Sequence, residues 1–185
     1  GIAAAFGSVA ALGWVTFRSG KPDPSMMVNG MLAGLVAITA ACAFVQPWAA
    51  ATIGVIAGVI VIEVVWFVER RLKIDDPVGA IAVHGVCGLF GVLAVGIFAD
   101  GSYGAGWNLT DTTETAGTGV TGVLYDASLG VRQLGAQAVG VLVICTVIFG
   151  LAYGFFSLQN RLTKGGIRPE AEHEIAGLDL VEMGV

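Results

Sequence analysis

Long apolar stretches that carry almost no charge are the feature that most limits how this chain can fold. Residues 78–98 contain no acidic or basic side chain except His84, and within residues 25–68 the only charged residue is Glu63. As a helix, the first of these stretches is about 30 Å long, which matches the hydrocarbon core of a bilayer. The mean hydropathy of +0.83, with 12% charged residues, is far from that of a soluble domain. We therefore expect an all-α polytopic membrane protein.

Five apolar segments are expected to cross the membrane as helices. Polar breaks that contain helix-starting residues separate them. In two of these breaks, Asp23-Pro24 and Asp76-Pro77, the aspartate is expected to cap a helix that begins at the proline. The five predicted spans cover residues 1–17, 26–44, 48–68, 78–98 and 134–158.

Basic residues are distributed unevenly over the connections and predict the orientation. Eight of the nine Lys and Arg residues lie in three alternate connecting or terminal segments, whereas Arg132 lies on the opposite side, next to a polar acidic loop. The positive-inside rule places the three segments and the C-terminus in the cytoplasm. We expect a helical bundle over residues 1–162 and a cytoplasmic tail over residues 163–185 of a multi-pass cell-membrane protein. The eight residues are Arg18, Lys21, Arg70, Arg71, Lys73, Arg161, Lys164 and Arg168.

Several classes of function are not expected. The net charge of -5 comes mostly from the loop and the tail, so a nucleic-acid partner is not predicted. Cys42, Cys87 and Cys145 lie in apolar runs and are predicted to be free packing residues. The spans and the tail contain no metal cluster, phosphate loop or nucleophile–base set, so we predict no metal, no cofactor and no enzyme.

His84 is a functional-site hypothesis, because an ionisable group inside the membrane costs several kcal/mol unless it faces protein or a wet cavity. Gly85, Gly88 and Gly91 cover an adjoining face, and His84 is related to the last two by i, i+4 and i+7. The imidazole is therefore expected on a glycine-lined stripe that faces protein. Three roles remain open: a packed histidine bonded to a carbonyl, a metal ligand, or a conduction or proton-handling group.

Pairs of glycines at i and i+4 recur in the predicted spans. Two glycines at this spacing remove the side chains from one helix face, which lets helix backbones approach closely in lipid. The sequence therefore predicts a tightly packed bundle at three pairs: Gly30 and Gly34, Gly54 and Gly58, and Gly150 and Gly154.

Glu63 is the other charge expected inside the membrane. It lies near the cytoplasmic end of its span, at the level of Arg70, Arg71 and Lys73. We expect a structural ion pair with that group, or a side chain that reaches the interface; a proton relay is the alternative.

Three sequence blocks identify a family resemblance. Residues 72–88, read as LKIDDPVGAIAVHGVCG and continuing into Gly96-Ile97-Phe98, closely resemble the tenth transmembrane helix of ammonium transporters of the Amt/Mep/Rh superfamily. Residues 29–43 are similar to the eighth helix, and residues 177–179 resemble the C-terminal tail signature. The resemblance covers the chain apart from the external loop. It implies helices seven to eleven of an eleven-helix fold, with the remaining helices and their sites outside this sequence.

The resemblance also implies roles for individual residues. His84 falls on the second of two histidines that meet in a narrow hydrophobic pore at the centre of each subunit of a trimer. Ala80 falls on a pore-lining position and Thr39 on the threonine of the eighth helix, whereas Gly79 stands where some bacterial members carry an aspartate. Structural or regulatory roles are expected for Asp75, Asp76, Gly177 and Asp179.

The function that follows from the resemblance is transport of ammonium or ammonia across a membrane. The tail is expected to pack under a neighbouring subunit and to take part in regulation, with a PII-type protein as its partner at the cytoplasmic face. The alternative is an ammonium sensor, in which the same fold is joined to a signalling domain after the tail. From its first and last residues, we expect the native chain to continue beyond both ends.

Overall fold

The computed structural model describes residues 1–105 and 119–177. Their regular structure is helical, apart from an antiparallel bridge between Asp100 and Thr121. Each of the five predicted spans contains a helix. Within the described ranges, four helices are long and apolar enough to cross a membrane, whereas the helix in the second segment is apolar but has only 16 residues. The all-helical, multi-pass prediction is confirmed to that extent.

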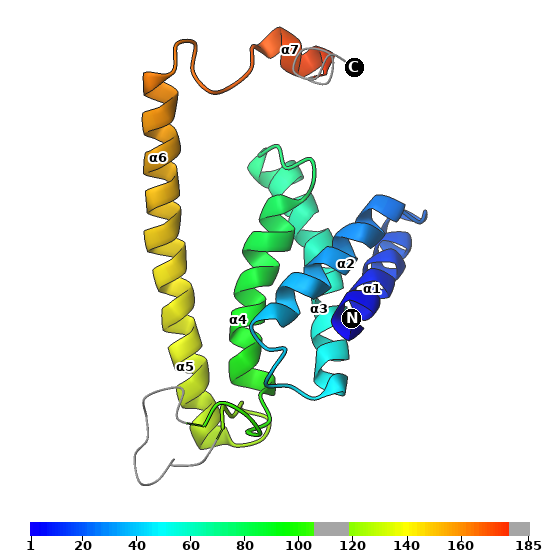
Figure 1. The fold of residues 1–185 in the computed structure, drawn as a ribbon. Helices are drawn as coiled ribbons and strands as arrows, with labels where there is room; N and C mark the ends of the chain where they lie inside the picture. Colours follow the sequence, from blue (N-terminus) through cyan, green and yellow to red (C-terminus); the bar gives the residue numbers. More distant parts are fainter. Residues whose placement is uncertain (106–118, 178–185) are drawn as a thin grey trace. The chain divides into compact units, whose positions relative to one another are not determined.

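The chain divides into two compact units, residues 1–141 and 142–185. In the first unit, α1, α2 and α3 pack against one another, and α4 packs against α2 and α3 (Figure 1). Its elements are α1 (Ile2–Ser19), α2 (Pro24–Thr39), α3 (Pro47–Phe67), the π-helices η1 (Val68–Leu72) and η2 (Ile81–Val86), α4 (Cys87–Phe98) and the start of α5 (Ala127–Val143). The second unit contains η3 (Ile144–Ile148), a π-helix, with α6 (Phe149–Leu162) and α7 (Ala171–Ala176).

The break between the first two helices forms as predicted. Gly20 ends α1 in the left-handed conformation, with φ of 76°, and its N–H donates to the Thr16 carbonyl at 2.8 Å. Asp23 then caps α2, because its carboxylate accepts from the backbone N–H of Ser25 at 2.9 Å and of Met26 at 3.3 Å. Pro24 occupies the first helical position.

The second helix ends five residues earlier than predicted, at Thr39 instead of Phe44. Beyond Thr39 the carbonyls bond three residues ahead instead of four: Ala41 N–H donates to Ile38, and Phe44 N–H donates to Ala41. The Phe44 carbonyl accepts from the Asp100 N–H at 2.8 Å. Turns closed by i to i+3 hydrogen bonds and a long-range hydrogen bond to Asp100 therefore replace the last turn of the predicted helix. Hydropathy alone does not reveal this change.

The fourth helix does not begin at Pro77, so that part of the prediction is wrong. Residues 76–79 form a turn closed by the Gly79 N–H, which donates to the Asp76 carbonyl at 2.9 Å, and the helix follows it. Asp at the first position, Pro at the second and Gly at the fourth match the residue preferences of a type I turn. Gly79 has φ of 69°, which a residue with a side chain adopts only with strain.

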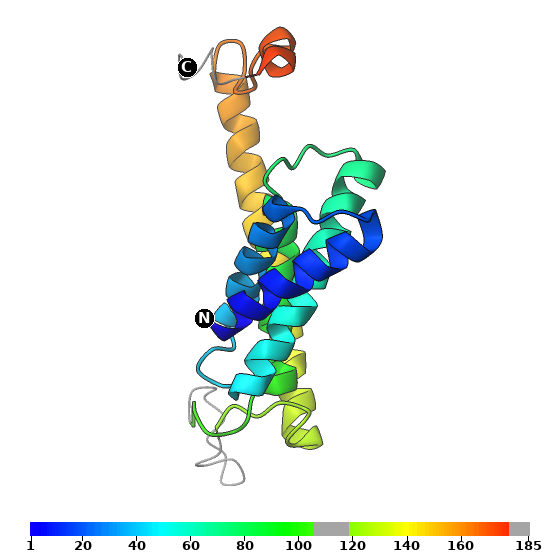
Figure 2. The same cartoon turned by 90° about the vertical axis from the view of Figure 1, so that its right-hand side faces the viewer.

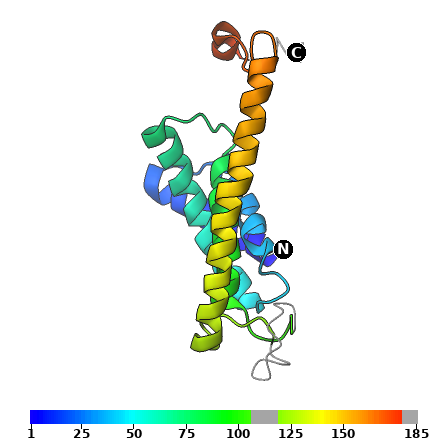
Figure 3. The same ribbon diagram turned by 90° about the vertical axis from the view of Figure 1, so that its left-hand side faces the viewer.

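The fifth helical stretch is longer than the predicted span. From Ala127 to Leu162 the helical segments follow one another without a break (Figure 3). Asp126 starts this stretch, because its carboxylate accepts from the Leu129 N–H at 2.9 Å. Polar Arg132 and Gln133 lie in the added turns, which explains why hydropathy places the start at Leu134.

Alpha-helices 1, 2 and 3 meet backbone to backbone at glycines (Figure 2 shows α1 crossing the bundle obliquely). A methyl carbon added to Gly34 of α2 would overlap the Ala3 carbonyl oxygen, and one added to Gly54 of α3 would lie 2.8 Å from the Ala3 Cα. Gly7 of α1 approaches the carbonyl oxygens of both neighbouring helices. The predictions for Gly30 and Gly34 and for Gly54 and Gly58 are therefore confirmed.

The third glycine pair behaves differently in this chain. Carbons added to Gly150 and Gly154 of α6 would meet nothing within 4 Å among the described residues. The close packing predicted for this pair is therefore not found within residues 1–105 and 119–177.

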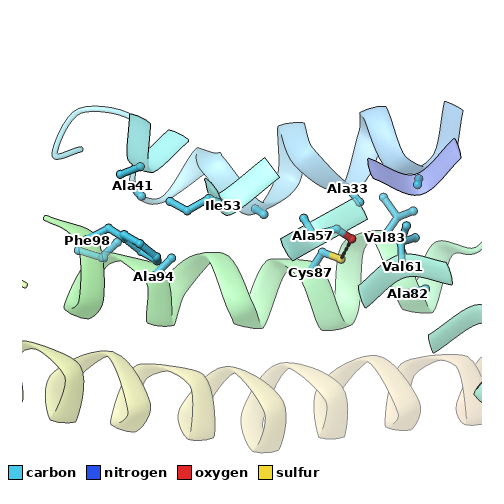
Figure 4. Packing of buried hydrophobic residues seen from close by; sticks show 14 of the residues in the cluster. Ala33, Ala41, Ile53, Ala57, Val61, Ala82, Val83, Cys87, Ala94 and Phe98 are labelled. Carbon is cyan, nitrogen blue, oxygen red and sulfur yellow. Dashed lines mark hydrogen bonds between the residues drawn. The ribbon is translucent and has the colours of Figure 1, made fainter. Parts of the chain in front are cut away.

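Small residues dominate the core of the first unit (Figure 4). Two alanines on α2 (Ala33 and Ala37) and two on α3 (Ala49 and Ala57) are fully buried. Ile53 and Val61 are larger buried side chains of the same cluster. The Cys87 thiol of α4 lies 3.7 Å from the Ala57 carbonyl oxygen of α3. Close backbone approach and small side chains thus replace a bulky core. The buried alanines of this cluster include Ala33, Ala37, Ala41, Ala49 and Ala57.

The glycine junction predicts a steric effect of one carbon atom. Gly34→Ala should lower the free energy of unfolding by about 1–3 kcal/mol, because the methyl group overlaps a backbone carbonyl that cannot rotate away. Gly13→Ala is the matched control, since its added carbon meets nothing within 4 Å. The midpoint of thermal unfolding of the full-length protein in detergent should therefore fall for Gly34→Ala only. Equal midpoints for the two variants would contradict the predicted backbone contact at Gly34.

The cap of α2 predicts an acid dependence. Bonding from the Ser25 hydroxyl and the Met26 N–H lowers the Asp23 pKa from its usual 3.8. The cap therefore stabilises the fold fully above about pH 4, and this contribution is lost as the pH falls through the lowered pKa. Asp23→Asn keeps an oxygen acceptor that does not titrate. The loss of thermal stability between pH 5 and pH 3 should be smaller in this variant than in the wild type, and identical pH profiles would contradict the prediction.

Candidate functional site

His84 is the fourth residue of η2 and is exposed in this chain. The expectation that its ring faces protein is not met by contacts among the described residues, and it stays a prediction for the complete protein. Val83 and Cys87, which are 1% and 0% exposed, occupy the packed face instead. The reason is local: the helix around His84 is a π-helix, so the spacing assumed for a regular α-helix does not apply.

The predicted glycine stripe divides into a packed part and an open part. A carbon added to Gly91 would lie 2.9 Å from the Ala37 Cα of α2, and one added to Gly88 would lie 3.7 Å from a Val36 methyl. Gly85, in contrast, is exposed, and an added carbon meets nothing within 4 Å. Two of the three glycines therefore seat the helix on α2, while Gly85 shares the open side with His84.

The two other predicted pore residues are also exposed. Ala80 is the residue before η2, and Thr39 ends the neighbouring helix α2. The Thr39 hydroxyl donates to the Val36 carbonyl at 2.7 Å, so it is held against its own helix. Because α2 packs along η2 and α4, Thr39, Ala80 and His84 lie on adjacent helices and are all accessible.

Asp76 fixes the start of the histidine helix. Its buried carboxylate, in a residue only 5% exposed, accepts from the Ala80 N–H at 2.8 Å and from the Ile81 N–H at 3.0 Å. These are two of the backbone donors that a helix leaves without an intrahelical partner. Asp75, the other predicted structural aspartate, is exposed.

Asn29 of α2 is a site residue whose contact was not predicted. A carbon added to Gly79 would lie 3.2 Å from the Asn29 side-chain nitrogen and 3.3 Å from a Val65 methyl of α3. The turn before the histidine helix is thus pressed against two neighbouring helices. The Asp-Pro-x-Gly pattern was available in the sequence and indicates this turn, whereas its contact with Asn29 depends on tertiary packing.

Glu63 forms an ion pair, as expected, but with a different partner. Its carboxylate lies 3.3 Å from the Arg18 Nε of α1, and the Trp14 indole nitrogen donates to it at 2.7 Å. The predicted pair with Arg70, Arg71 or Lys73 is therefore wrong. Alpha-helix 1 packs on α3 beside Glu63, whereas the predicted cations lie beyond it on or after η1. The guanidinium groups of Arg18 and Arg70 both lie over the Trp66 ring, 5.4 and 4.9 Å from its centroid.

The three cysteines lie in different environments. Cys87 is buried, as predicted, whereas Cys42 and Cys145 are exposed and are not packing residues inside this chain. In the described part of the chain, no three His, Cys, Asp or Glu side chains lie close enough together to hold a metal ion.

The tail begins with a fold-back after α6. The Asn160 side chain accepts from the Ile167 N–H at 2.9 Å, and Gly165 and Gly166 adopt positive φ. An ion pair between Arg168 and Glu174, at 2.8 Å, lowers the Glu174 pKa. Gly177 follows α7 with φ of 99°, and Asp179 lies outside the described residues.

Comparison with known proteins decides the family. The model of the Ammonium Transporter Family matches residues 1–185. The chain belongs to the ammonium transporter family. It is 44% identical over 181 residues to ammonium transporter Amt2 of Archaeoglobus fulgidus, covering 98% of this chain and 36% of the relative. It is 37% identical over 185 residues to putative ammonium transporter sll1017 of Synechocystis sp., covering 99% and 35%.

Solved structures of the family share the fold. The structure of the Sensor Amt Protein matches with a TM-score of 0.78 and 37% identity, covering 98% of this chain and 40% of that one. Mep2 of Candida albicans matches with a TM-score of 0.75 and 27% identity, covering 99% and 38%. The chain therefore spans 35–40% of the length of these four family members. Membership of a transporter family agrees with the prediction that the chain is not an enzyme.

The double cap at Asp76 predicts a loss of stability on substitution. Asp76→Ala should lower the free energy of unfolding by about 1–2 kcal/mol, because two backbone N–H groups lose their acceptor in a buried place. Asp75→Ala, at the exposed neighbouring residue, is the control and should change it by less than about 0.5 kcal/mol. Thermal unfolding of the full-length protein checks this, and a larger loss for Asp75→Ala would contradict it.

Proposed function

We propose that the complete protein conducts ammonium, as ammonia with or without a separate proton, through a hydrophobic pore in which His84 contacts the transported molecule. The observation that carries the proposal is an imidazole on the open side of an apolar span in a chain of the ammonium transporter family. Ala80, one turn before it, and Thr39 of α2 are proposed to line the same path.

The chemistry of ammonium and ammonia favours an apolar pore that contains an imidazole. Ammonium is a strongly hydrated cation, so moving it bare into an apolar pore costs many kcal/mol, whereas neutral ammonia loses only hydrogen bonds. A neutral imidazole offers one donor and one acceptor, which suits a small molecule with the same groups. His84 supplies such a group within residues 78–98, which are otherwise apolar.

The finer architecture is part of the same proposal. We infer that the chain supplies helices seven to eleven of an eleven-helix subunit, and that a second histidine outside this sequence pairs with His84. A homotrimer, a cytoplasmic C-terminus and a tail over residues 163–185 that a PII-type protein contacts complete the proposal. The open side of η2, at His84 and Gly85, is consistent with a missing partner there.

An ammonium sensor is the second candidate. It is favoured by the similarity to the solved Sensor Amt Protein, with 37% identity over 98% of this chain. In this second proposal, the same membrane fold is joined to a signalling domain that follows the tail. The coding sequence that follows Val185 distinguishes the two: a kinase-like or cyclase-like domain supports sensing, and a short polar end supports transport.

Replacement of His84 tests the proposed function directly. His84→Leu keeps a similar volume but removes both hydrogen-bonding groups. In full-length protein reconstituted into liposomes, we expect at least about a ten-fold loss of the ammonium-evoked current, which corresponds to about 1.4 kcal/mol. His173→Leu, in the tail helix α7, is the control. A His84→Leu current equal to that of the wild type would contradict the proposal.

A further inference from the structure

The helix that carries His84 contains a single π-helical turn, η2, directly before α4. A π-helix closes its hydrogen bonds from i to i+5 instead of i to i+4, so each ring contains one residue more than in an α-helix. Such single turns inside α-helices occur frequently at functional sites. Because His84 lies inside this turn, the side chains that face the core differ from those that a regular α-helix would bury.

In a regular α-helix, His84 would face the core and Ala82 would not. Successive residues are about 100° apart, so His84 would lie about 60° around the axis from the buried Cys87, and Ala82 about 140° from it. The structure shows the opposite order: Ala82 is 0% exposed and His84 is exposed. Figure 4 shows Ala82, Val83 and Cys87 among the buried side chains.

Two anchors hold the extra residue in place. At the first end, Asp76 accepts from the N–H groups of Ala80 and Ile81. At the other end, the fully buried Cys87 thiol lies against the Ala57 carbonyl of α3. Between Asp76 and Cys87 the π-turn holds one residue more than a regular α-helix would. One extra residue rotates the preceding segment by about 100° around the helix axis.

We propose that the π-turn Ile81–Val86 is a positioning element that turns the His84 imidazole away from the packed face and onto the open face of the helix. The proposal rests on the proposed function, because the open face is where the transported molecule would meet the ring. Without the turn, the imidazole would point toward the tightly packed alanines and glycines of α2 and α3. A regular helix here would therefore bury the ring and expose Ala82.

Thiol labelling tests the geometry without reference to transport. Ala82→Cys and His84→Cys are compared in full-length protein in which the exposed Cys42 and Cys145 are replaced by alanine. Native Cys87, which is buried, is the internal control and should stay unlabelled. With a small neutral methanethiosulfonate, we expect His84→Cys to react at least ten-fold faster than Ala82→Cys. Equal rates, reversed rates or no reaction at either position would overturn the proposal.

Deletion of one residue tests the functional consequence. Removing Ile81, a residue that is 40% exposed, should convert the π-turn to a regular helix, while Ile81→Ala keeps the residue count. In liposomes, we expect the deletion to reduce the ammonium-evoked current at least ten-fold and to slow labelling at position 84, and we expect Ile81→Ala to retain the current. A folded deletion variant with the wild-type current would overturn the proposal.

The two assays also separate the hypotheses. If the wild-type protein gives no ammonium-evoked current, the proposed function fails, and the labelling rates at positions 82 and 84 still decide whether the π-turn sets the direction of the ring. If the deletion variant does not fold, the single-cysteine variants remain decisive, because they keep the length of the chain.

Discussion

Backbone contact between helices at glycine is the constraint on which the rest of the structure depends. Within a bilayer, lipid is as apolar as the side chains, so helices associate through close packing and not through a hydrophobic drive. At the junction of α1, α2 and α3, Gly7, Gly34 and Gly54 bring backbones close enough that an added methyl group would overlap a neighbouring carbonyl. Gly91 then brings α4 against Ala37 of α2.

The position of the candidate site follows from this packing. Gly91 and Cys87 fix α4 on α2 and α3, and Asp76 fixes the start of the preceding helical segment. The π-turn between these contacts therefore has little rotational freedom. The π-turn accommodates the one extra residue between these two fixed ends. A packing constraint at one end and a capping constraint at the other therefore determine where the imidazole lies.

Much of the fold was predictable from local chemistry, and the failures have physical causes. Asp23-Pro24 and Asp76-Pro77 are the same dipeptide, yet only the first starts a helix directly, because Gly79 completes a turn after the second. Hydropathy located all five helical segments, but it could not detect the tightened turns after Thr39.

The candidate site was predictable to a smaller extent. His84 could be singled out because an ionisable side chain inside an apolar span is costly and therefore indicates a function. The direction in which its ring points depends on a π-turn, and a π-turn has no hydropathy pattern. The partner of Glu63 was missed because Arg18 is distant in the sequence and becomes adjacent only when α1 packs on α3.

The central claim is that the His84 ring contacts the transported molecule. Nitrogen-15 NMR of histidine-labelled full-length protein in a bilayer tests it most directly, with the His84 resonance assigned by substitution. On addition of ammonium we expect the His84 ring resonances to shift in a saturable manner, while those of His173 in α7 stay unchanged. A His84 resonance that does not respond to ammonium, or that shifts no more than His173, would contradict the claim.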